Sequence, residues 1–336
     1  MNLEILKIFE KAYSNIPLSK EECIKLLSLE DTSQEALIMR GIASDIIRKK
    51  HDNAGVIFAQ IGLECSPCPA NCSFCSFAKD YTCMPSIRLD DEAIVANTQM
   101  FTGSDELYGL WLMTMAEYDL DHYLHSVEVV KKNVTGSTLL LTNVGDTSYE
   151  AFCEMKAAGI DGVYHCWRLG EGRDTGIAPE RRKETAYNAK KAGLKFLDAL
   201  EPIGPEHTVE ELAEHIMWSR DMETIQYGAM SRVPVPGTLF EGTKMLPALT
   251  LSKILAVIVL TFAGSKEMPW MGSHEPTTHA FLSGANMITA ESGINPRDTV
   301  LDTENHHGWS ITKCKAMLKS TGYTRIARAD GSYVDL

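Results

Sequence analysis

Short apolar runs alternate with amphipathic helical stretches along most of the chain. Eight such runs predict strands, at residues 56–61, 109–115, 138–142, 162–167, 195–200, 224–230, 267–271 and 285–290. Strands that are apolar throughout are buried on both faces, as in parallel sheets covered by helices. Eight strand–helix alternations therefore predict an α/β fold, a (β/α)8 TIM-type barrel. An open doubly wound sheet is the alternative.

The segments outside the alternation predict helices that cover the barrel. Residues 1–52 form an N-terminal helical cap in this prediction, with Ser19 placed before Glu22 as helix starts prefer. The barrel takes residues 53–300, and residues 301–336 form a C-terminal helical extension packed on it, so the chain is one structural domain overall. The apolar stretch at 249–264 contains Lys253 and is too short to cross a bilayer, which predicts a buried helix.

The composition and charge of the chain limit its possible binding partners and its location. The formal net charge of -13 argues against nucleic acid, because binding a phosphate backbone requires a basic surface. The N-terminus lacks the charge pattern and apolar core of an export signal, and no stretch predicts a membrane span. We therefore expect a cytoplasmic protein. In a chain of 336 residues, nine cysteines favour metal-binding thiolates over a disulfide framework.

Three cysteines are tightly grouped after the first predicted strand, in a Cys-x3-Cys-x2-Cys motif formed by Cys68, Cys72 and Cys75. Three thiolates hold three irons of a 4Fe-4S cluster and leave the fourth iron open. Structural zinc is the alternative, but it usually takes four protein ligands in two separated pairs. A second alternative is an electron-transfer ferredoxin site with Cys65 as the fourth ligand. The position at the C-terminal end of a barrel strand favours a catalytic site.

The motif, with the aromatic Phe74 just before its last cysteine, resembles the signature of the radical S-adenosylmethionine (SAM) superfamily. The resemblance implies that SAM binds the open iron and is cleaved to a 5′-deoxyadenosyl radical. Three further segments resemble the group that contains biotin synthase, the hydrogenase maturase HydE and methylornithine synthase. They are a Pro-Gly-Thr turn at 236–238, Ser-Gly-Ala-Asn at 283–286 and Gly-Pro-Glu at 204–206.

The resemblance also implies a set of SAM-binding residues. Arg168 and Glu171 match the Arg-x-Glu segment with which the group contacts SAM, and a guanidinium suits the carboxylate of the cofactor. The alternative is a solvated loop with an ordinary salt bridge. Thr114 and Glu117 stand where the group often has Gly-Gly-Glu. The remaining candidates for this role are Phe74, Glu201 and Arg232.

Cysteines outside the motif bear on the reaction. The common biotin synthases carry three barrel-strand cysteines around a sulfur-donating cluster, and the matching strands here have none. Cys166 lies on the fourth predicted strand, and alternation predicts that it faces the substrate chamber with Tyr164 and Arg168, which makes it a candidate catalytic residue. Cys65 and Cys83, with Cys166 or Cys314, are candidates to hold an auxiliary iron–sulfur cluster. Ordinary core packing is the alternative.

The resemblance extends furthest to the biotin synthases of strict anaerobes, which use a larger auxiliary cluster as sulfur source. It implies sulfur insertion into dethiobiotin, with a flavodoxin- or ferredoxin-type electron donor. Two alternatives stay open: radical rearrangement or fragmentation of an amino-acid or metallocofactor precursor, and an iron–sulfur carrier that cleaves no SAM. A homodimer and a monomer are both compatible with the sequence.

Overall fold

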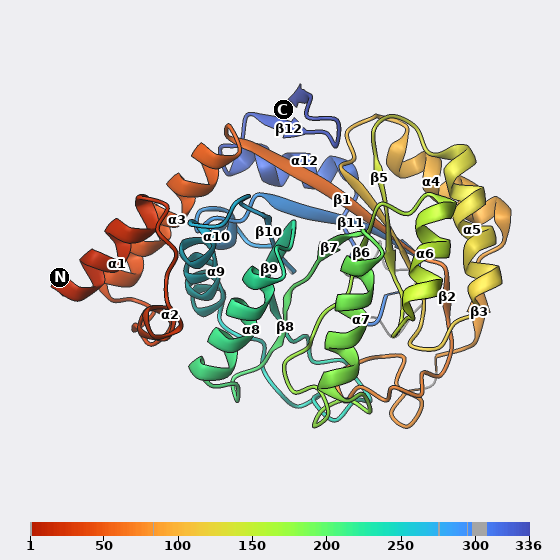
Figure 1. The fold of residues 1–336 in the computed structure, drawn as a ribbon, viewed down its shortest axis with the longest axis horizontal. Helices are drawn as coiled ribbons and strands as arrows, with labels where there is room; N and C mark the ends of the chain where they lie inside the picture. The colour runs from red at the N-terminus through yellow and green to blue at the C-terminus, as the bar shows by residue number, and fades with distance from the viewer. Residues whose placement is uncertain (1, 83, 275, 294, 298–307) are drawn as a thin grey trace.

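The computed structural model describes residues 2–82, 84–274, 276–293, 295–297 and 308–336, and its centre is a closed parallel barrel (Figure 1). The barrel strands are β1 (Ala54–Gly62), β4 (Gly109–Met113), β5 (Leu139–Asn143), β6 (Gly162–Tyr164), β7 (Lys195–Leu197), β9 (Gln226–Ser231), β10 (Trp270–Ser273) and β11 (Met287–Gly293). Parallel pairing of β11 with β1 closes the ring. The TIM-type barrel is therefore confirmed, and the open sheet is excluded.

Helices lie outside the barrel between successive strands (Figure 1). They are α4 (Asp91–Thr102), α5 (Leu120–Asn133), α6 (Tyr149–Ala158), α7 (Pro179–Lys191), α8 (Val209–Asp221), α9 (Ala248–Phe262) and α10 (Thr278–Phe281). Short polar side chains begin several of them: Ser148 accepts a hydrogen bond from the backbone of Ala151, and Thr208 forms a capping box with Glu211. Gly159, with φ of 117°, ends α6 in a left-handed conformation that favours glycine.

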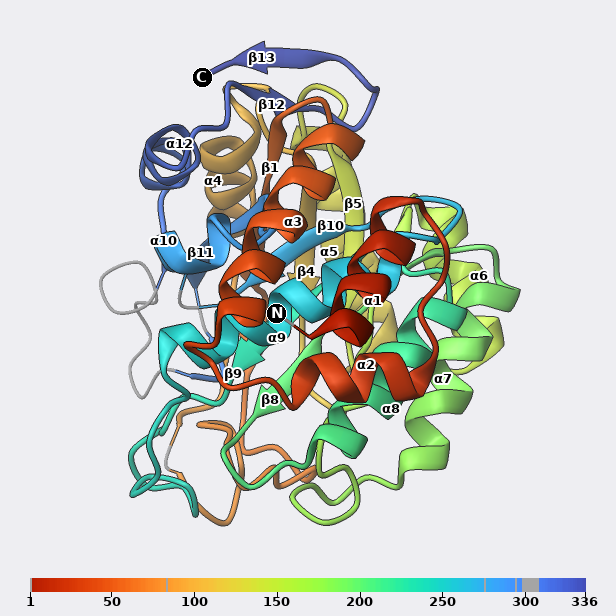
Figure 2. The same ribbon diagram turned by 90° about the vertical axis from the view of Figure 1, so that its left-hand side faces the viewer.

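Three N-terminal helices, α1 (Leu3–Tyr13), α2 (Lys20–Leu27) and α3 (Gln34–Lys50), pack over α8 and α9 (Figure 2). Ser19 caps α2 through the predicted capping box with Glu22. This layer covers the outer side of α9 and explains why the helix is apolar on nearly every face. Lys253, inside α9, extends its ammonium to the backbone of Leu29 and to Asp31. The prediction of a buried helix here is confirmed, and no described helix is long and apolar enough to span a membrane.

The C-terminal segment contains more than the predicted helix. After α12 (Ile311–Ser320), β12 (Arg325–Ala327) pairs in parallel with the start of β1, and β13 (Tyr333–Asp335) pairs antiparallel with β12. This ribbon extends the sheet at the N-terminal end of β1. The predicted boundary between residues 300 and 301 lies outside the described residues.

The strand predicted at 195–200 is divided in two. β7 ends at Leu197, and β8 (Leu200–Ile203) begins after a break at Asp198, where the side chain accepts a hydrogen bond from the backbone N–H of Ala199. A polar side chain that binds the backbone of the neighbouring residue competes with the hydrogen bonds between strands, so the strand is interrupted. A further hairpin, β2 (Glu64–Cys65) with β3 (Ile87–Arg88), brackets the cysteine loop.

Aromatic rings fill the N-terminal part of the barrel interior. Phe58 stacks on Trp111 with ring centroids 4.7 Å apart, and Trp111 meets Tyr164 edge-on at 5.7 Å. Gly109 makes room for this arrangement, because a Cβ there would lie 2.8 Å from the ring of Phe58. The open part of the barrel is therefore at its C-terminal end.

Candidate active site

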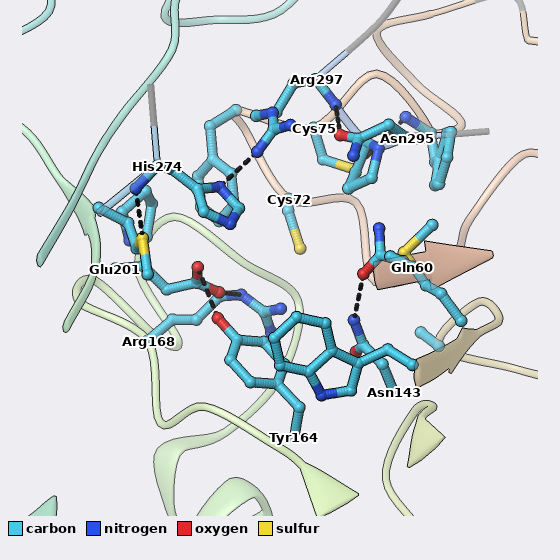
Figure 3. A pocket seen from close by; sticks show the side chains of 18 of the residues that line it. Gln60, Cys72, Cys75, Asn143, Tyr164, Arg168, Glu201, His274, Asn295 and Arg297 are labelled. Atoms are coloured by element: carbon cyan, nitrogen blue, oxygen red, sulfur yellow. Dashed lines mark hydrogen bonds and ion pairs between the residues drawn. The ribbon is translucent and has the colours of Figure 1, made fainter. Parts of the chain in front are cut away.

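A cavity of about 210 Å³ opens at the C-terminal end of the barrel (Figure 3). Its walls come from the ends of β1, β4, β5, β6, β8, β9 and β11 and from the loop that follows β2. Four methionines and several rings make much of its surface apolar: Met113, Met115, Met230, Met287, Phe74, Phe77, Trp111 and Tyr164. This is where catalytic groups of such barrels gather.

The motif loop brings Cys68, Cys72 and Cys75 to this cavity, and all three thiols line it. Backbone bonds hold the loop in shape: the N–H of Cys68 donates to the carbonyl of Phe77 at 2.7 Å, and the N–H of Ser73 donates to the carbonyl of Asp174 at 2.8 Å. The N–H of Phe77 also donates to Sγ of Cys75 at 3.4 Å. The loop therefore presents three sulfur atoms from one compact segment.

The chemistry of these donors fits an iron–sulfur cluster. Burial raises the pKa of Cys72 to about 11 and raises that of Cys75 further, so the free thiols stay protonated at neutral pH. Soft thiolate ligands select iron–sulfur clusters, and metal binding displaces the protons. Three ligands leave one iron of a 4Fe-4S cluster without a protein ligand. The residues present thus suit a cluster with an open iron.

Beside the cysteines, Arg168 and Glu201 form an ion pair that faces the cavity (Figure 3). The Nε of Arg168 lies 3.4 Å from Oε1 of Glu201, and Oη of Tyr164 donates to Oε2 of the same carboxylate at 3.0 Å. Burial acts to lower the pKa of Arg168, but the charge of Glu201 outweighs it and raises that pKa well above its usual value. Arg168 therefore stays charged at the cavity wall.

A second ionic layer lies behind Arg168. Glu171, whose side chain is fully buried, accepts from the backbone N–H of Arg168 and from Nε of Arg182, both at 3.2 Å. Arg182 and His165 both contact Asp146, at 3.4 and 3.3 Å. Burial alone would raise the pKa of Asp146, but His165 and Arg182 lower it to about 2. Glu171 and Asp146 thus fix the loop that carries Arg168.

The other predicted cofactor residues divide into two sets. Phe74, Thr114 and Arg232 line the cavity with Arg168 and Glu201. Arg232 is 3% exposed, binds Glu206 through both terminal nitrogens and lies over the ring of Phe240. Glu171 does not line the cavity, and neither does Glu117, which is exposed to solvent.

Cys166 lies beside residues of the cavity wall but does not itself line the cavity. Tyr164 and Arg168 line the cavity, but Cys166 does not; it is 1% exposed and packs against Ala199 and Met230. Tyr164 packs against the same cluster, so Cys166 lies on the side that the alternation predicted, although β6 itself ends at Tyr164. A catalytic role for Cys166 stays a prediction.

The candidate auxiliary ligands lie apart. Sγ of Cys65 donates to the carbonyl of Pro85 at 3.0 Å, and Cys314 is buried on α12 outside the barrel. Cys65, Cys166 and Cys314 belong to three separate hydrophobic clusters. Within the described part of the chain they do not form one ligand set. Cys83 lies outside the described residues.

Sequence reasoning missed three amide side chains deep in the cavity. The amide nitrogen of Asn143 donates to Oε1 of Gln60 at 3.2 Å, and Gln226 lines the cavity from β9. Each is the one amide in a largely apolar strand, which is the signal that points to them. His274 also lines the cavity, where its ring accepts from Arg297 (Figure 3).

Comparisons with known proteins agree with this architecture. No family model matches the chain. The biotin synthase of Clostridium acetobutylicum is 22% identical over 306 residues, which cover 84% of this chain and 89% of that protein. The biotin synthase of a Hydrogenobaculum species is 24% identical over 294 residues, covering 84% and 86%.

Solved structures share the fold. Methylornithine synthase (PylB) superimposes with a TM-score of 0.76 at 17% identity, over 94% of this chain and 95% of that one. The FeFe-hydrogenase maturase HydG from Carboxydothermus hydrogenoformans gives a TM-score of 0.78 at 16% identity, over 97% and 80%. At such identities the match establishes the barrel and its covering helices.

Proposed function

We propose a reaction for this chain, a radical SAM enzyme of the biotin synthase-like group: sulfur insertion into dethiobiotin after reductive cleavage of SAM. The observation that carries the proposal is the convergence of Cys68, Cys72 and Cys75 on one cavity at the C-terminal end of the barrel. The relatives named biotin synthase favour dethiobiotin as the substrate.

Cys68, Cys72 and Cys75 would hold the 4Fe-4S cluster, which when bound supplies an electron and an open iron for the cleavage of SAM. Arg168 and Glu201 would bind the methionine end of SAM. That end carries one ammonium and one carboxylate, and the ion pair offers the complementary charges side by side. Phe74, Thr114 and Arg232 line the same cavity and are proposed to complete the site.

The apolar walls of the inner cavity would shield a radical intermediate from water. Met230, Met287 and Trp111 give the inner cavity an apolar surface, which excludes water from the reacting C–H bond. Glu171 and Asp146 act as positioning residues, because each binds groups that fix Arg168 and neither lines the cavity. A flavodoxin- or ferredoxin-type protein is the proposed electron donor.

One observation favours a second candidate. Sulfur insertion requires a sulfur donor, and Cys65, Cys166 and Cys314, the described candidates for auxiliary ligands, lie in three separate hydrophobic clusters. Rearrangement or fragmentation of an amino-acid or metallocofactor precursor needs no such donor. It uses the same cysteine loop and the same cavity.

Anaerobic reconstitution with iron and sulfide separates the two candidates. We would count iron and sulfide, add SAM and a reductant with and without dethiobiotin, and assay 5′-deoxyadenosine and biotin. Iron beyond one cubane per chain, with biotin formed, is the result expected for sulfur insertion. One cubane with 5′-deoxyadenosine but no biotin would overturn sulfur insertion and favour rearrangement. Absence of 5′-deoxyadenosine would contradict SAM cleavage.

A further inference from the structure

A path of aromatic rings runs from the cavity through the barrel interior toward its N-terminal end. Tyr164 meets Trp111 edge-on with ring centroids 5.7 Å apart, and Trp111 stacks on Phe58 at 4.7 Å. Phe58 in turn lies 5.3 Å from the ring of Tyr108, the residue before β4. Rings at these separations are in contact, so the four side chains form one continuous path, called here the ring path.

The two ends of the ring path are partly exposed and its middle is buried. Tyr164 is half-buried and lines the cavity, where its phenol points to the Arg168–Glu201 pair (Figure 3). Tyr108 is half-buried at the N-terminal end of the barrel, where β4 begins. The two rings between them are 5% and 0% exposed. The path therefore joins the cavity to a second partly exposed region through the packed interior.

The types of ring on this path favour one-electron chemistry. Phenols and indoles are among the side chains that lose an electron most readily, and a phenol O–H bond is weaker than the C–H bond that an alkyl radical forms when it takes hydrogen. Burial raises the pKa of Tyr164 well above its usual value, so this phenol keeps its hydrogen. Among the described residues that line the cavity, Tyr164 is the one phenol. It is a hydrogen donor distinct from the three motif thiols, which are proposed cluster ligands.

Packing alone does not explain an indole at position 111. Nε1 of the buried Trp111 makes no hydrogen bond within the described part of the chain, and a buried N–H without a partner costs stability. A phenylalanine ring would supply aromatic contacts without that cost. An easily oxidised ring between Tyr164 and Phe58 gives a reason for the indole.

We propose that the ring path disposes of the 5′-deoxyadenosyl radical when it forms in a cavity that holds no substrate. The inference goes beyond the proposed function and rests on one part of it, the cleavage of SAM; it holds for sulfur insertion and for rearrangement alike. In the first step, the O–H bond of Tyr164 breaks and its hydrogen atom forms a C–H bond at C5′. The products are 5′-deoxyadenosine and a neutral tyrosyl radical on Tyr164.

The second step moves the radical away from the cavity. An electron passes from Tyr108 to Tyr164 through the two rings between them. Tyr108 releases its phenol proton to solvent, and Tyr164 takes up a proton from solvent, so one phenol is restored as the other becomes a radical. Donor and acceptor are the same kind of group, so the transfer is nearly balanced in free energy. A soluble thiol then gives a hydrogen atom to Tyr108, and two of the resulting thiyl radicals combine to a disulfide.

The first measurement follows the hydrogen atom that Tyr164 donates. Reconstituted protein is equilibrated in D2O, reduced, freed of excess reductant and mixed with SAM without substrate, and 5′-deoxyadenosine is analysed by mass spectrometry. Because a phenol hydrogen exchanges with solvent and a C–H hydrogen does not, the wild type should give monodeuterated product. Tyr164→Phe should lose this deuterium. Tyr187→Phe, the same change at a 54% exposed position on α7, is the matched control and should keep it.

Electron paramagnetic resonance of freeze-quenched samples from the same reaction follows the radical. The wild type should show a tyrosyl signal that narrows when ring-deuterated tyrosine is incorporated, which keeps the test decisive if Tyr164→Phe fails to fold. Tyr108→Phe removes the second phenol, and Phe58→Leu removes the ring that bridges to it. Both variants should share a hyperfine pattern different from that of the wild type, since their radical is confined to Tyr164.

The outcomes separate the two steps from the proposed function. Wild-type product without deuterium, or equal deuterium in the wild type and folded Tyr164→Phe, would overturn hydrogen donation by Tyr164. Identical spectra in the wild type, Tyr108→Phe and Phe58→Leu would overturn the transfer to Tyr108. Absence of 5′-deoxyadenosine from every sample would instead contradict SAM cleavage, which is the proposed function itself, and the inference with it.

Discussion

The cavity has two ends that differ in charge. Its mouth is the C-terminal opening around Cys68, Cys72 and Cys75, and its floor is the inner end around Trp111 and Gln226. At the mouth, arginines and carboxylates stand in pairs around the three motif thiols, and a second layer of Glu171, Asp146 and Arg182 supports them. At the floor, rings and uncharged amides surround a space in which Gln226 and Trp111 have no protein partner. The mouth is suited to a charged cofactor, whereas Trp111 and Gln226 give the floor uncharged lining groups.

The largest expected effect comes from removing a thiol at the mouth. Cys72→Ser should lower reconstituted iron by about four atoms per chain relative to the wild type, the content of one cubane, and SAM-dependent 5′-deoxyadenosine should fall below detection, because the remaining two thiols cannot hold the cluster. Iron analysis and product chromatography measure this. Cys153→Ser, on the half-buried side of α6, is the control and should keep both values. Equal iron in the two variants would refute the assignment of the ligands.

The second largest expected effect is a loss of folding stability when the layer of Glu171, Asp146 and Arg182 is broken. Asp146→Asn leaves Arg182 and His165 without their buried carboxylate, so we expect the free energy of unfolding at pH 7 to fall by about 3 kcal/mol. Denaturation in urea under anaerobic conditions measures it. The matched change Asp91→Asn breaks an exposed pair with His125 and should cost about 0.5 kcal/mol or less. A similar loss of stability in both variants would show that the buried carboxylate of Asp146 contributes no more than an exposed ion pair.

A conservative change tests the geometry of the mouth. Arg168→Lys keeps the charge but loses the planar fork, so the dissociation constant for SAM should rise about tenfold. Equilibrium dialysis of labelled SAM gives the value. Arg173→Lys is a control at an exposed pair with Asp174 and should leave the constant unchanged. The proposal for Arg168 fails if both variants bind SAM like the wild type.

The smallest effect concerns a buried carboxyl beside the floor. Burial raises the pKa of Asp198 to about 7, against hydrogen bonds from Ser219 and the backbone of Ala199. Because this pKa lies above the unfolded value of about 4, its stabilising contribution is complete below that pH and is lost as pH rises to 7. Asn cannot ionise. The stability of Asp198→Asn relative to wild type should therefore increase by about 1 kcal/mol between pH 5.5 and 6.5. A constant difference would contradict the raised pKa.

Much of the fold was predictable because its signals are local. Apolar runs indicated the eight strands, and the spacing of Cys68, Cys72 and Cys75 indicated a three-thiol cluster site before any geometry was known. Failures arose where a local pattern ended: Asp198 interrupts one strand, and β6 stops before Cys166. Neither interruption follows from hydrophobic alternation.

The floor of the cavity was not predictable for a different reason. Trp111 and Gln226 lie more than a hundred residues apart in the sequence, and only closure of the barrel brings their strands to opposite sides of one space. That their polar atoms lack partners is a property of the packed structure. In the sequence, Gln226 is visible only as an amide within a largely apolar strand.

The central claim is that three thiols at the mouth hold a cluster whose fourth iron is open to SAM. Electron paramagnetic resonance of the reconstituted, reduced protein tests it most directly, with spectra recorded before and after SAM is added without substrate. A cluster signal whose g values shift on addition of SAM, as the open iron gains ligands, is the predicted result. A cluster signal that SAM leaves unchanged would contradict the account.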